Sequence, residues 1–222
     1  MEKQELKHFE NQDIRTFGRR HGKKLSLRKQ YLMENMLPTI ALKAPEIKEH
    51  SAILEIGFGN GEHLRDLALQ HPDKIIVGAE PFANGVAALL SAITNESGNT
   101  PLNEYKNIRV FPDDVRILLK DLKDVNFDEI WILHPDPWPK AKHEKRRLLN
   151  HEFLNLLSEY IGKTGKIIIG TDHWEYYDWI KEQLKQTKLS IKSTELNIIQ
   201  TRYQIKNKAG TTNPKYLILG NQ

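Results

Sequence analysis

Three short apolar runs constrain the fold of this chain more than any other feature. They are Ile53-Leu54, Ile75-Ile76-Val77 and Ile167-Ile168-Ile169. Nearly continuous apolar strands indicate a parallel sheet that helices cover on both faces. Helical patterns alternate with the expected strands along the chain, as in α/β proteins. The sequence therefore predicts one doubly wound, mostly parallel, seven-stranded sheet with a C-terminal hairpin.

The expected elements can be placed by their periodicity. A short helix near residues 25–36 should end at Pro38, because proline lacks the N–H that a helix needs. Residues 95–106 form an insertion without usable periodicity. We expect strands at residues 52–56, 74–79, 108–111, 127–133, 166–170, 196–203 and 215–219, and helices at residues 62–70, 83–94, 114–122, 148–161 and 173–186.

Length and composition bound the class of protein. With 222 residues, a single domain is expected. The chain has no cysteine, which excludes disulfides and fits a reducing, cytoplasmic setting. No apolar run approaches the roughly 20 residues of a membrane span, and the polar start is no signal peptide, so we expect a soluble protein. Residues 1–24 lack apolar periodicity and should form a basic arm, mobile without its partner, before a domain at residues 25–222.

Basic residues are concentrated in two short segments. The net charge is only +4, from 33 Lys and Arg against 29 Asp and Glu. No acid occurs between Ile14 and Met33, where seven cations lie, and five more follow Trp138. This clustering indicates a phosphate-binding surface, although basic arms and solvated loops can have the same composition. Our candidates for phosphate contacts are Arg19, Arg20, Lys145, Arg146 and Arg147.

A glycine-rich loop follows the first expected strand. In Glu55-Ile-Gly57-Phe-Gly59-Asn-Gly61, the glycines permit positive φ angles and a close approach of the backbone to a ligand. A dinucleotide-binding fingerprint would need glycine at position 62, where the chain has Glu62. The observed spacing instead resembles the first motif of S-adenosylmethionine-dependent methyltransferases.

Acids stand at the ends of the next two expected strands. Glu80 ends the second strand and is placed to accept hydrogen bonds from both hydroxyls of a ribose, although NAD enzymes use an acid there too. Asp114 follows the third strand and is our candidate for the adenine amino group. Its neighbour Asp113 would serve as a helix N-cap. The choice between these two aspartates stays open.

The stretch from His134 to Arg147, His-Pro-Asp-Pro-Trp-Pro-Lys-Ala-Lys-His-Glu-Lys-Arg-Arg, follows the expected strand at residues 127–133. Its three prolines forbid a helix or a ladder, because each lacks an N–H and fixes φ. A stiff loop should therefore leave the carboxyl end of a strand, where open α/β sheets bind ligands. Asp136 and Trp138 beside a basic run suit a nucleobase joined to its phosphates, whereas a solvated turn is the plainer alternative.

Pro135-Asp-Pro-Trp138 and its basic tail resemble the signature of the bacterial tRNA (guanine-N7-)-methyltransferases. This block is the specific part of the resemblance, since the glycine loop occurs in many methyltransferases. The likeness covers roughly residues 15–219. Further matching segments follow in the order of the family: Arg15-Thr-Phe-Gly-Arg-Arg20, the glycine loop, Gly78-Ala-Glu80, Asp113-Asp114 and Thr201-Arg-Tyr203.

The resemblance implies a methyltransferase that uses S-adenosylmethionine to produce 7-methylguanosine in tRNA, at the variable-loop guanosine conventionally numbered 46. It implies a cofactor side and a substrate side, with Asp136 as the catalytic residue. On the cofactor side are Glu55, Gly57, Gly59, Gly61, Glu80, Asp114 and Asp136, and on the substrate side Lys140, Asp172, Thr201, Arg202, Tyr203 and Gln204.

Some of these positions admit a structural alternative or depart from the family pattern. Asp172 also suits a helix cap, and the segment from Thr201 to Gln204 also suits a strand end with one exposed arginine. His134 stands where the family usually has Phe or Tyr. Gln204 stands where it usually has Glu, which removes a charge but keeps hydrogen-bonding capacity.

Guanine N7 carries a lone pair and no proton, so methylation there needs no general base. Asp136 would orient guanine and offset the positive charge of the product.

One alternative is an RNA methyltransferase acting on another base atom, although an exocyclic amino group would call for an Asp/Asn-Pro-Pro-aromatic loop. Another is an RNA-binding module that keeps the fold without catalysis. We expect no metal site, because the histidines are not arranged as ligands. Oligomeric state, monomer or homodimer, stays open.

Overall fold

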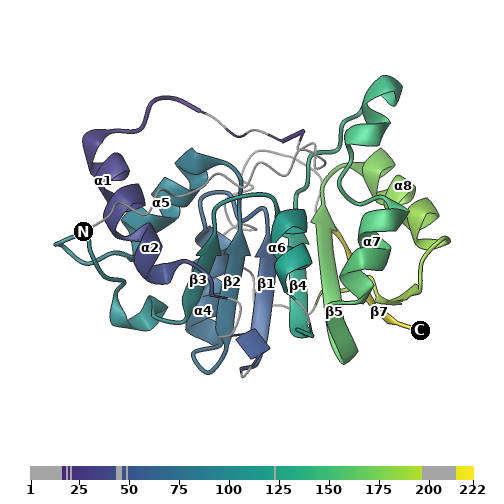
Figure 1. Cartoon of the computed structure of the whole chain (residues 1–222). Helices are drawn as coiled ribbons and strands as arrows, with labels where there is room; N and C mark the ends of the chain where they lie inside the picture. Colours follow the sequence, from purple (N-terminus) through teal and green to yellow (C-terminus); the bar gives the residue numbers. More distant parts are fainter. Residues whose placement is uncertain are drawn as a thin grey trace.

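A seven-stranded sheet forms the centre of the structure, a computed structural model that describes residues 17, 18, 20, 22–43, 47–48, 50–122, 124–196 and 214–222 (Figure 1). The strand order is β3-β2-β1-β4-β5-β7-β6, and β7 runs antiparallel to both β5 and β6. The predicted doubly wound, mostly parallel sheet with an antiparallel C-terminal pair is confirmed. The strands are β1 Ala52–Ile56, β2 Ile75–Ala79, β3 Ile108–Phe111, β4 Phe127–Leu133, β5 Ile161–Thr171, β6 Leu189–Ser193 and β7 Lys215–Asn221.

Helices cover both faces of this sheet and form two apolar cores. The core on one face contains side chains from α1, α2, α4 and α5, and the core on the other contains side chains from α6, α7 and α8. The helices are α1 Leu27–Asn35, α2 Leu37–Ile40, α4 Glu62–Gln70, α5 Ala83–Ile93, α6 Val115–Asp121, α7 His151–Ser158 and α8 Trp174–Leu184, with 3₁₀ turns η1 Asn103–Tyr105 and η2 Ala141–Arg146.

β1 shows why the apolar runs predicted this arrangement. Ile53 packs into the core with α4 and α5, whereas Ala52, Leu54 and Ile56 pack into the opposite core. Successive side chains of a strand point to opposite faces, so a strand covered on both sides is apolar at nearly every position. In β1 the exception is the buried Glu55. Burial of each such aliphatic side chain contributes about 1.5–3 kcal/mol relative to leaving it exposed.

Some element boundaries differ from the prediction. The helix expected at residues 148–161 spans only His151–Ser158, because Asn150 caps it by accepting a hydrogen bond from Phe153 N at 2.9 Å and β5 begins soon afterwards. β6 lies at Leu189–Ser193, whereas residues 197–203 of the expected strand lie outside the described residues. Pro38 lies in the first turn of α2, where its missing N–H leaves no hydrogen bond unmade.

The described part of the N-terminal segment lies against the start of α5. Ala83 N donates to the Arg20 carbonyl oxygen at 3.4 Å, and the Asn84 side-chain amide donates to the Lys23 carbonyl at 2.8 Å. A mobile arm over residues 1–24 remains a prediction, since residues 1–16 lie outside the described part. None of the helices in the described residues is both long and apolar enough to cross a membrane.

Candidate active site

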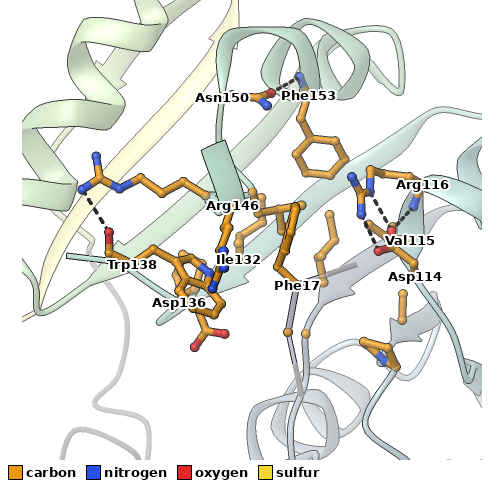
Figure 2. Close-up of a pocket in the computed structure, with 18 of the residues that line it drawn as sticks. Phe17, Asp114, Val115, Arg116, Ile132, Asp136, Trp138, Arg146, Asn150 and Phe153 are labelled. Atoms are coloured by element: carbon orange, nitrogen blue, oxygen red, sulfur yellow. Dashed lines mark hydrogen bonds and ion pairs between the residues drawn. The ribbon is translucent and has the colours of Figure 1, made fainter. Parts of the chain in front are cut away.

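A cavity of about 660 Å³ opens at the carboxyl edge of the sheet. The ends of β1, β2 and β4, the starts of α6 and α7, and Phe17 from the N-terminal segment contribute to its lining (Figure 2). The predicted site residues that it brings together are Gly57, Glu80, Asp114, Asp136, Lys145, Arg146 and Arg147.

The glycine loop turns sharply at the end of β1. Gly57, Gly59 and Gly61 have φ angles of 74°, 56° and 75°. Residues that carry a side chain rarely adopt this left-handed backbone region, so glycine is strongly favoured at these three positions of the turn. Gly57 N donates to Ala79 O and Gly61 N to Phe58 O, each at 2.8 Å. Gly57 lines the cavity, whereas the other two glycines shape the loop from outside the lining.

Glu80 ties this loop to the end of β2. Its Oε2 accepts a hydrogen bond from Gly59 N and its Oε1 accepts one from Phe82 N, both at 2.8 Å. The residue is buried, at 7% exposure. Burial raises the pKa of Glu80 above the ordinary 4.5, and the two backbone donors counteract only part of that effect. Glu80 therefore supports the loop and also presents a buried carboxylate to the cavity.

Asp114 combines a capping role with a place in the cavity lining. Its Oδ1 accepts from Arg116 N at 3.0 Å and so caps α6, and the Arg116 guanidinium binds the same carboxylate at 2.9 and 2.7 Å (Figure 2). Asp113 instead pairs with Arg20 and accepts from Asp114 N. The N-cap is therefore Asp114, not Asp113. Of the two, Asp114 lines the cavity.

Glu55 is a residue of β1 and does not belong to the cavity lining. Its side chain is buried, and Oε1 lies 3.3 Å from His63 Nδ1. The His63 ring packs against Trp131, with 4.8 Å between the ring centroids. Among the described residues, Glu55 Oε2 has no hydrogen-bond partner. The predicted contact of Glu55 with a cofactor stays a prediction.

The proline-rich loop after β4 carries two residues with left-handed backbone conformations. His134 has φ 50° and Trp138 has φ 41°. The prolines between and beside them fix their own φ angles, so these two residues must absorb the change of chain direction. His134 N donates to Gly170 O at 2.7 Å, which ties the start of the loop to β5. Asp136 between them is exposed and lines the cavity.

Arg146 stacks between two aromatic rings beside Asp136 (Figure 2). Its Cζ lies 5.0 Å from the ring centroid of Trp138 and 5.5 Å from that of Phe17. A guanidinium over an aromatic face is attracted by the ring quadrupole. The same cationic turn contains His143, whose pKa is lowered by desolvation and by the neighbouring Arg146, Lys142 and Lys140.

Arg147 is placed differently from a phosphate-binding residue. It is 7% exposed, and its Nε donates to the Pro137 carbonyl oxygen at 2.9 Å. Its guanidinium also lies over the rings of Trp179 and Tyr176, at 4.9 and 5.6 Å. The predicted phosphate contact does not suit this buried position. Lys145 and Lys140 are exposed, and Arg19 lies outside the described residues.

On the substrate side, the structure describes Asp172 but not residues 201–204. Asp172 is exposed, and its Oδ1 lies 3.6 Å from His134 Nδ1. The cap of α8 is the His173 side chain, which accepts from Tyr176 N at 3.3 Å, so the helix-cap alternative for Asp172 is wrong. Thr201, Arg202, Tyr203 and Gln204 lie outside the described residues.

Comparisons with known proteins agree on the family. A family model described as "Putative methyltransferase" matches residues 49–215. A tRNA (guanine-N(7)-)-methyltransferase of Neorickettsia sennetsu is 34% identical over 88% of this chain and 86% of its own length. This chain belongs to the tRNA (guanine-N(7)-)-methyltransferase family. Proteins of the same name from Zymomonas mobilis and Paramagnetospirillum magneticum are 35% and 37% identical, over 86% and 80% of this chain and 87% and 79% of their own lengths.

Solved structures support the fold of this family member at low sequence identity. An antibiotic-related methyltransferase superposes with a TM-score of 0.55 and 16% identity, covering 90% of this chain and 97% of its own. A 16S rRNA (adenine(1408)-N(1))-methyltransferase from Catenulisporales acidiphilia, solved with cosubstrate SAM, gives a TM-score of 0.52 and 17% identity, covering 80% and 90%. Both likenesses concern the methyltransferase fold.

Several cavity residues of this methyltransferase were missed in the sequence. Phe17 belongs to a segment without periodicity, and Arg116 and Phe153 look like ordinary positions of helices α6 and α7. Arg116 follows a strand-end acid by two residues, and that spacing is the one signal that could have indicated its pairing. Within the described ranges, no group of three His, Asp or Glu side chains is arranged to hold a metal ion.

Proposed function

We propose that this protein transfers a methyl group from S-adenosylmethionine to N7 of a guanine in the variable loop of tRNA. The observation that carries the proposal is the place of Asp136. Its loop contributes to the same cavity as Gly57, Glu80 and Asp114. One cavity thus combines features of a nucleoside site with a carboxylate that suits guanine. The names of the relatives support the same reaction.

The residues of the cavity fit this cofactor. A Cβ at Gly57 would meet nothing within 4 Å, so open space adjoins the backbone there. Each Glu80 oxygen has a second lone pair beyond its backbone donor, which suits the ribose hydroxyls. Asp114 offers acceptors for the adenine amino group, and Val115 and Phe153 offer apolar surface. When bound, the cofactor supplies a methyl group already activated by the sulfonium charge.

Asp136 has the chemistry to orient the acceptor base. The two carboxylate oxygens can accept from guanine N1–H and from the exocyclic amino group, a donor pair that adenine lacks. N7 needs no deprotonation, so the remaining tasks are in-line positioning and stabilisation of the positive charge that develops on the purine. An ionised Asp136 serves both tasks.

Exposed lysines beside this loop are suited to bind the phosphates of the tRNA backbone. Lys140, Lys142 and Lys145 are exposed on and before η2, and Lys145 also lines the cavity. Contacts of this kind position a nucleic acid without reading its sequence. The half-buried indole of Trp138, beside Arg146, offers aromatic surface for an unpaired base.

Incubation with unmodified tRNA and methyl-labelled cofactor, followed by mapping of the modified base, tests the proposal. The expected result is label at N7 of one variable-loop guanine. Label on an exocyclic amino group or another base atom would replace it with a different RNA methyltransferase activity. Tight tRNA binding without cofactor binding or transfer would establish the RNA-binding module instead.

A further inference from the structure

Arg147 makes a set of contacts that differs from those of the other cations in its segment. Its Nε donates to the carbonyl oxygen of Pro137 at 2.9 Å, and its Nη2 donates to that of Trp138 at 3.4 Å. These two carbonyls directly follow Asp136 in the chain. Arg147 is 7% exposed, whereas Lys145 two positions earlier is exposed. The guanidinium therefore makes its hydrogen bonds within the protein, to the loop that carries Asp136.

Its prolines limit the backbone hydrogen bonds that can fix the loop around Asp136. Pro135, Pro137 and Pro139 have no N–H and so cannot donate to a neighbouring strand or turn. Trp138 has φ 41°, and a bulky residue adopts this conformation only when its surroundings impose it. A fork of guanidinium donors can hold two successive carbonyls at once, as a single ammonium cannot.

Aromatic side chains of α8 fix the guanidinium in turn. The Arg147 Cζ lies 4.9 Å from the Trp179 ring centroid and 5.6 Å from that of Tyr176. Trp179 Nε1 donates to Glu144 Oε1 at 2.6 Å, and the buried Tyr176 hydroxyl accepts from Leu149 N at 3.4 Å. The loop carbonyls, η2 and α8 are therefore connected through Arg147 and these two rings.

We propose that Arg147 is a positioning residue for methyl transfer, which holds the loop so that Asp136 faces the acceptor base. This inference rests on the proposed function of Asp136. It assigns Arg147 no contact with phosphate, cofactor or guanine. Without the two hydrogen bonds to these carbonyls, the loop could relax from its left-handed conformation at Trp138, and a displacement of about 1 Å at a reacting group can cost about a hundredfold in rate.

Arg147→Lys is the decisive variant, because it keeps the positive charge but cannot hold both carbonyls. We expect the single-turnover transfer rate at saturating tRNA and cofactor to fall by about tenfold to a hundredfold. The KM for tRNA and its salt dependence should change little. Lys145→Gln is the contrasting variant, expected to raise the KM for tRNA and lower the salt dependence. Lys163→Gln, at an exposed lysine of β5, is the neutral control.

Two further measurements separate positioning from a general loss of structure. Trypsin should cleave residues 140–146 faster in Arg147→Lys than in the wild type, with the melting temperature nearly unchanged. This comparison needs no catalysis, so it still tests the inference if tRNA proves not to be the substrate. Trp179→Phe, which keeps a ring but removes the donor to Glu144, should shift rate and cleavage in the same direction by less.

Free methylguanidinium should restore part of the transfer rate to Arg147→Ala and none to Asp136→Ala. A wild-type rate and wild-type protease resistance in Arg147→Lys would overturn the inference. An intact limiting rate combined with a raised KM for tRNA and a reduced salt dependence would also overturn it, and would make Arg147 a phosphate-binding residue.

Discussion

Glu80 Oε2 accepts a hydrogen bond from Gly59 N at 2.8 Å, so the acid at the end of β2 holds the glycine loop that follows β1. The other oxygen, Oε1, accepts from Phe82 N at the same distance. The carboxylate is thus a brace between two chain segments before any ligand binds. A change at Glu80 should affect both the loop and the proposed contact with a ribose.

Glu80→Gln should weaken cofactor binding by about 1–3 kcal/mol, because the amide turns a donor toward one of the two backbone N–H groups. Calorimetry measures this change in affinity.

The raised pKa of Glu80 also leaves a protonated fraction at pH values above 4.5, so wild-type affinity should fall as the pH is lowered toward that value. Glu80→Gln should lack this part of the pH dependence, and Glu104→Gln, at an exposed position, should retain it. Equal affinities and equal pH profiles in all three proteins would remove Glu80 from the site.

Gly85 in α5 packs against the glycine loop, so a substitution there tests whether the position of that loop matters for cofactor binding. A Cβ at this position would lie 2.4 Å from the Gly59 carbonyl oxygen, so Gly85→Ala must displace the loop. Such overpacking costs about 1–3 kcal/mol of stability, even though alanine favours a helix more than glycine does. We expect a lower melting temperature and weaker cofactor binding. Gly162→Ala, where a Cβ meets nothing within 4 Å, is the matched control. An unchanged Gly85→Ala protein would show that the loop adapts freely.

The sequence was sufficient to predict the parallel part of the sheet and the edge at which the site lies. α4 and β4 have the predicted bounds, because strong apolar periodicity marks both. Glu80 and Asp114 lie together in the cavity because the carboxyl ends of parallel strands meet at one edge of a sheet. The proximity of these two acids follows from the order and direction of the strands, which short apolar patterns in the sequence predict.

The burial of Arg147 could not be read from its segment. In a run of five cations within eight residues, each looks solvated, and what distinguishes Arg147 is the pair of rings about thirty residues later in α8. Phe17 escaped prediction for a similar reason, since its partner Arg146 is far away in the sequence. Side-chain packing between distant segments is not encoded in the periodicity of either segment.

The exposed lysines near η2 should set the salt dependence of tRNA binding. Replacing Lys140, Lys142 and Lys145 by Gln should reduce the slope of log affinity against log salt by roughly 0.7–0.9 for each phosphate that a lysine no longer neutralises. Filter binding across a salt series measures the slope, and cofactor affinity should be unaffected. The control replaces Lys163, Lys166 and Lys188, which are also exposed but lie away from the cavity lining. Equal slopes in the two triple variants would place the tRNA elsewhere.

Asp128 in β4 provides a stability test remote from the cavity. Its Oδ2 accepts from Lys74 Nζ at 2.7 Å and from the Ser51 hydroxyl. Burial alone would raise the pKa of Asp128, but these hydrogen bonds outweigh it and lower the pKa below 3.8. The stabilising contribution is therefore present above pH 3.8 and is lost as the pH falls through the folded-state pKa. Because the pair is partly exposed, Asp128→Asn should cost only about 0.5–1 kcal/mol at neutral pH.

Urea unfolding at several pH values tests this prediction. The difference between wild type and Asp128→Asn should shrink as the pH is lowered below 3.8. Methyl transfer at neutral pH should be normal in the variant. A difference in stability that does not depend on pH would mean that packing, and not charge, determines the effect.

Asp136 offers the strictest test of the proposed chemistry. Because guanine N7 has no proton to remove, no general base has to titrate, and the single-turnover rate should not depend on pH across the neutral range. Asp136→Asn keeps the shape, loses the charge and turns a donor toward a guanine donor. We expect the rate to fall by at least about a hundredfold, as when one preorganised electrostatic partner is removed.

Cofactor affinity should fall much less than the rate in Asp136→Asn, because the charge acts mainly as positive charge develops on the purine. Asp136→Ala should be no more active. Quench-flow measurement of transfer to unmodified tRNA, with chemistry shown to be limiting, gives the rates. A rate that rises steadily through neutral pH would require a titrating base and would exclude a fixed anion as the sole requirement. Near-normal transfer by Asp136→Asn would exclude it as well, because the carboxylate charge would then contribute nothing that an amide cannot.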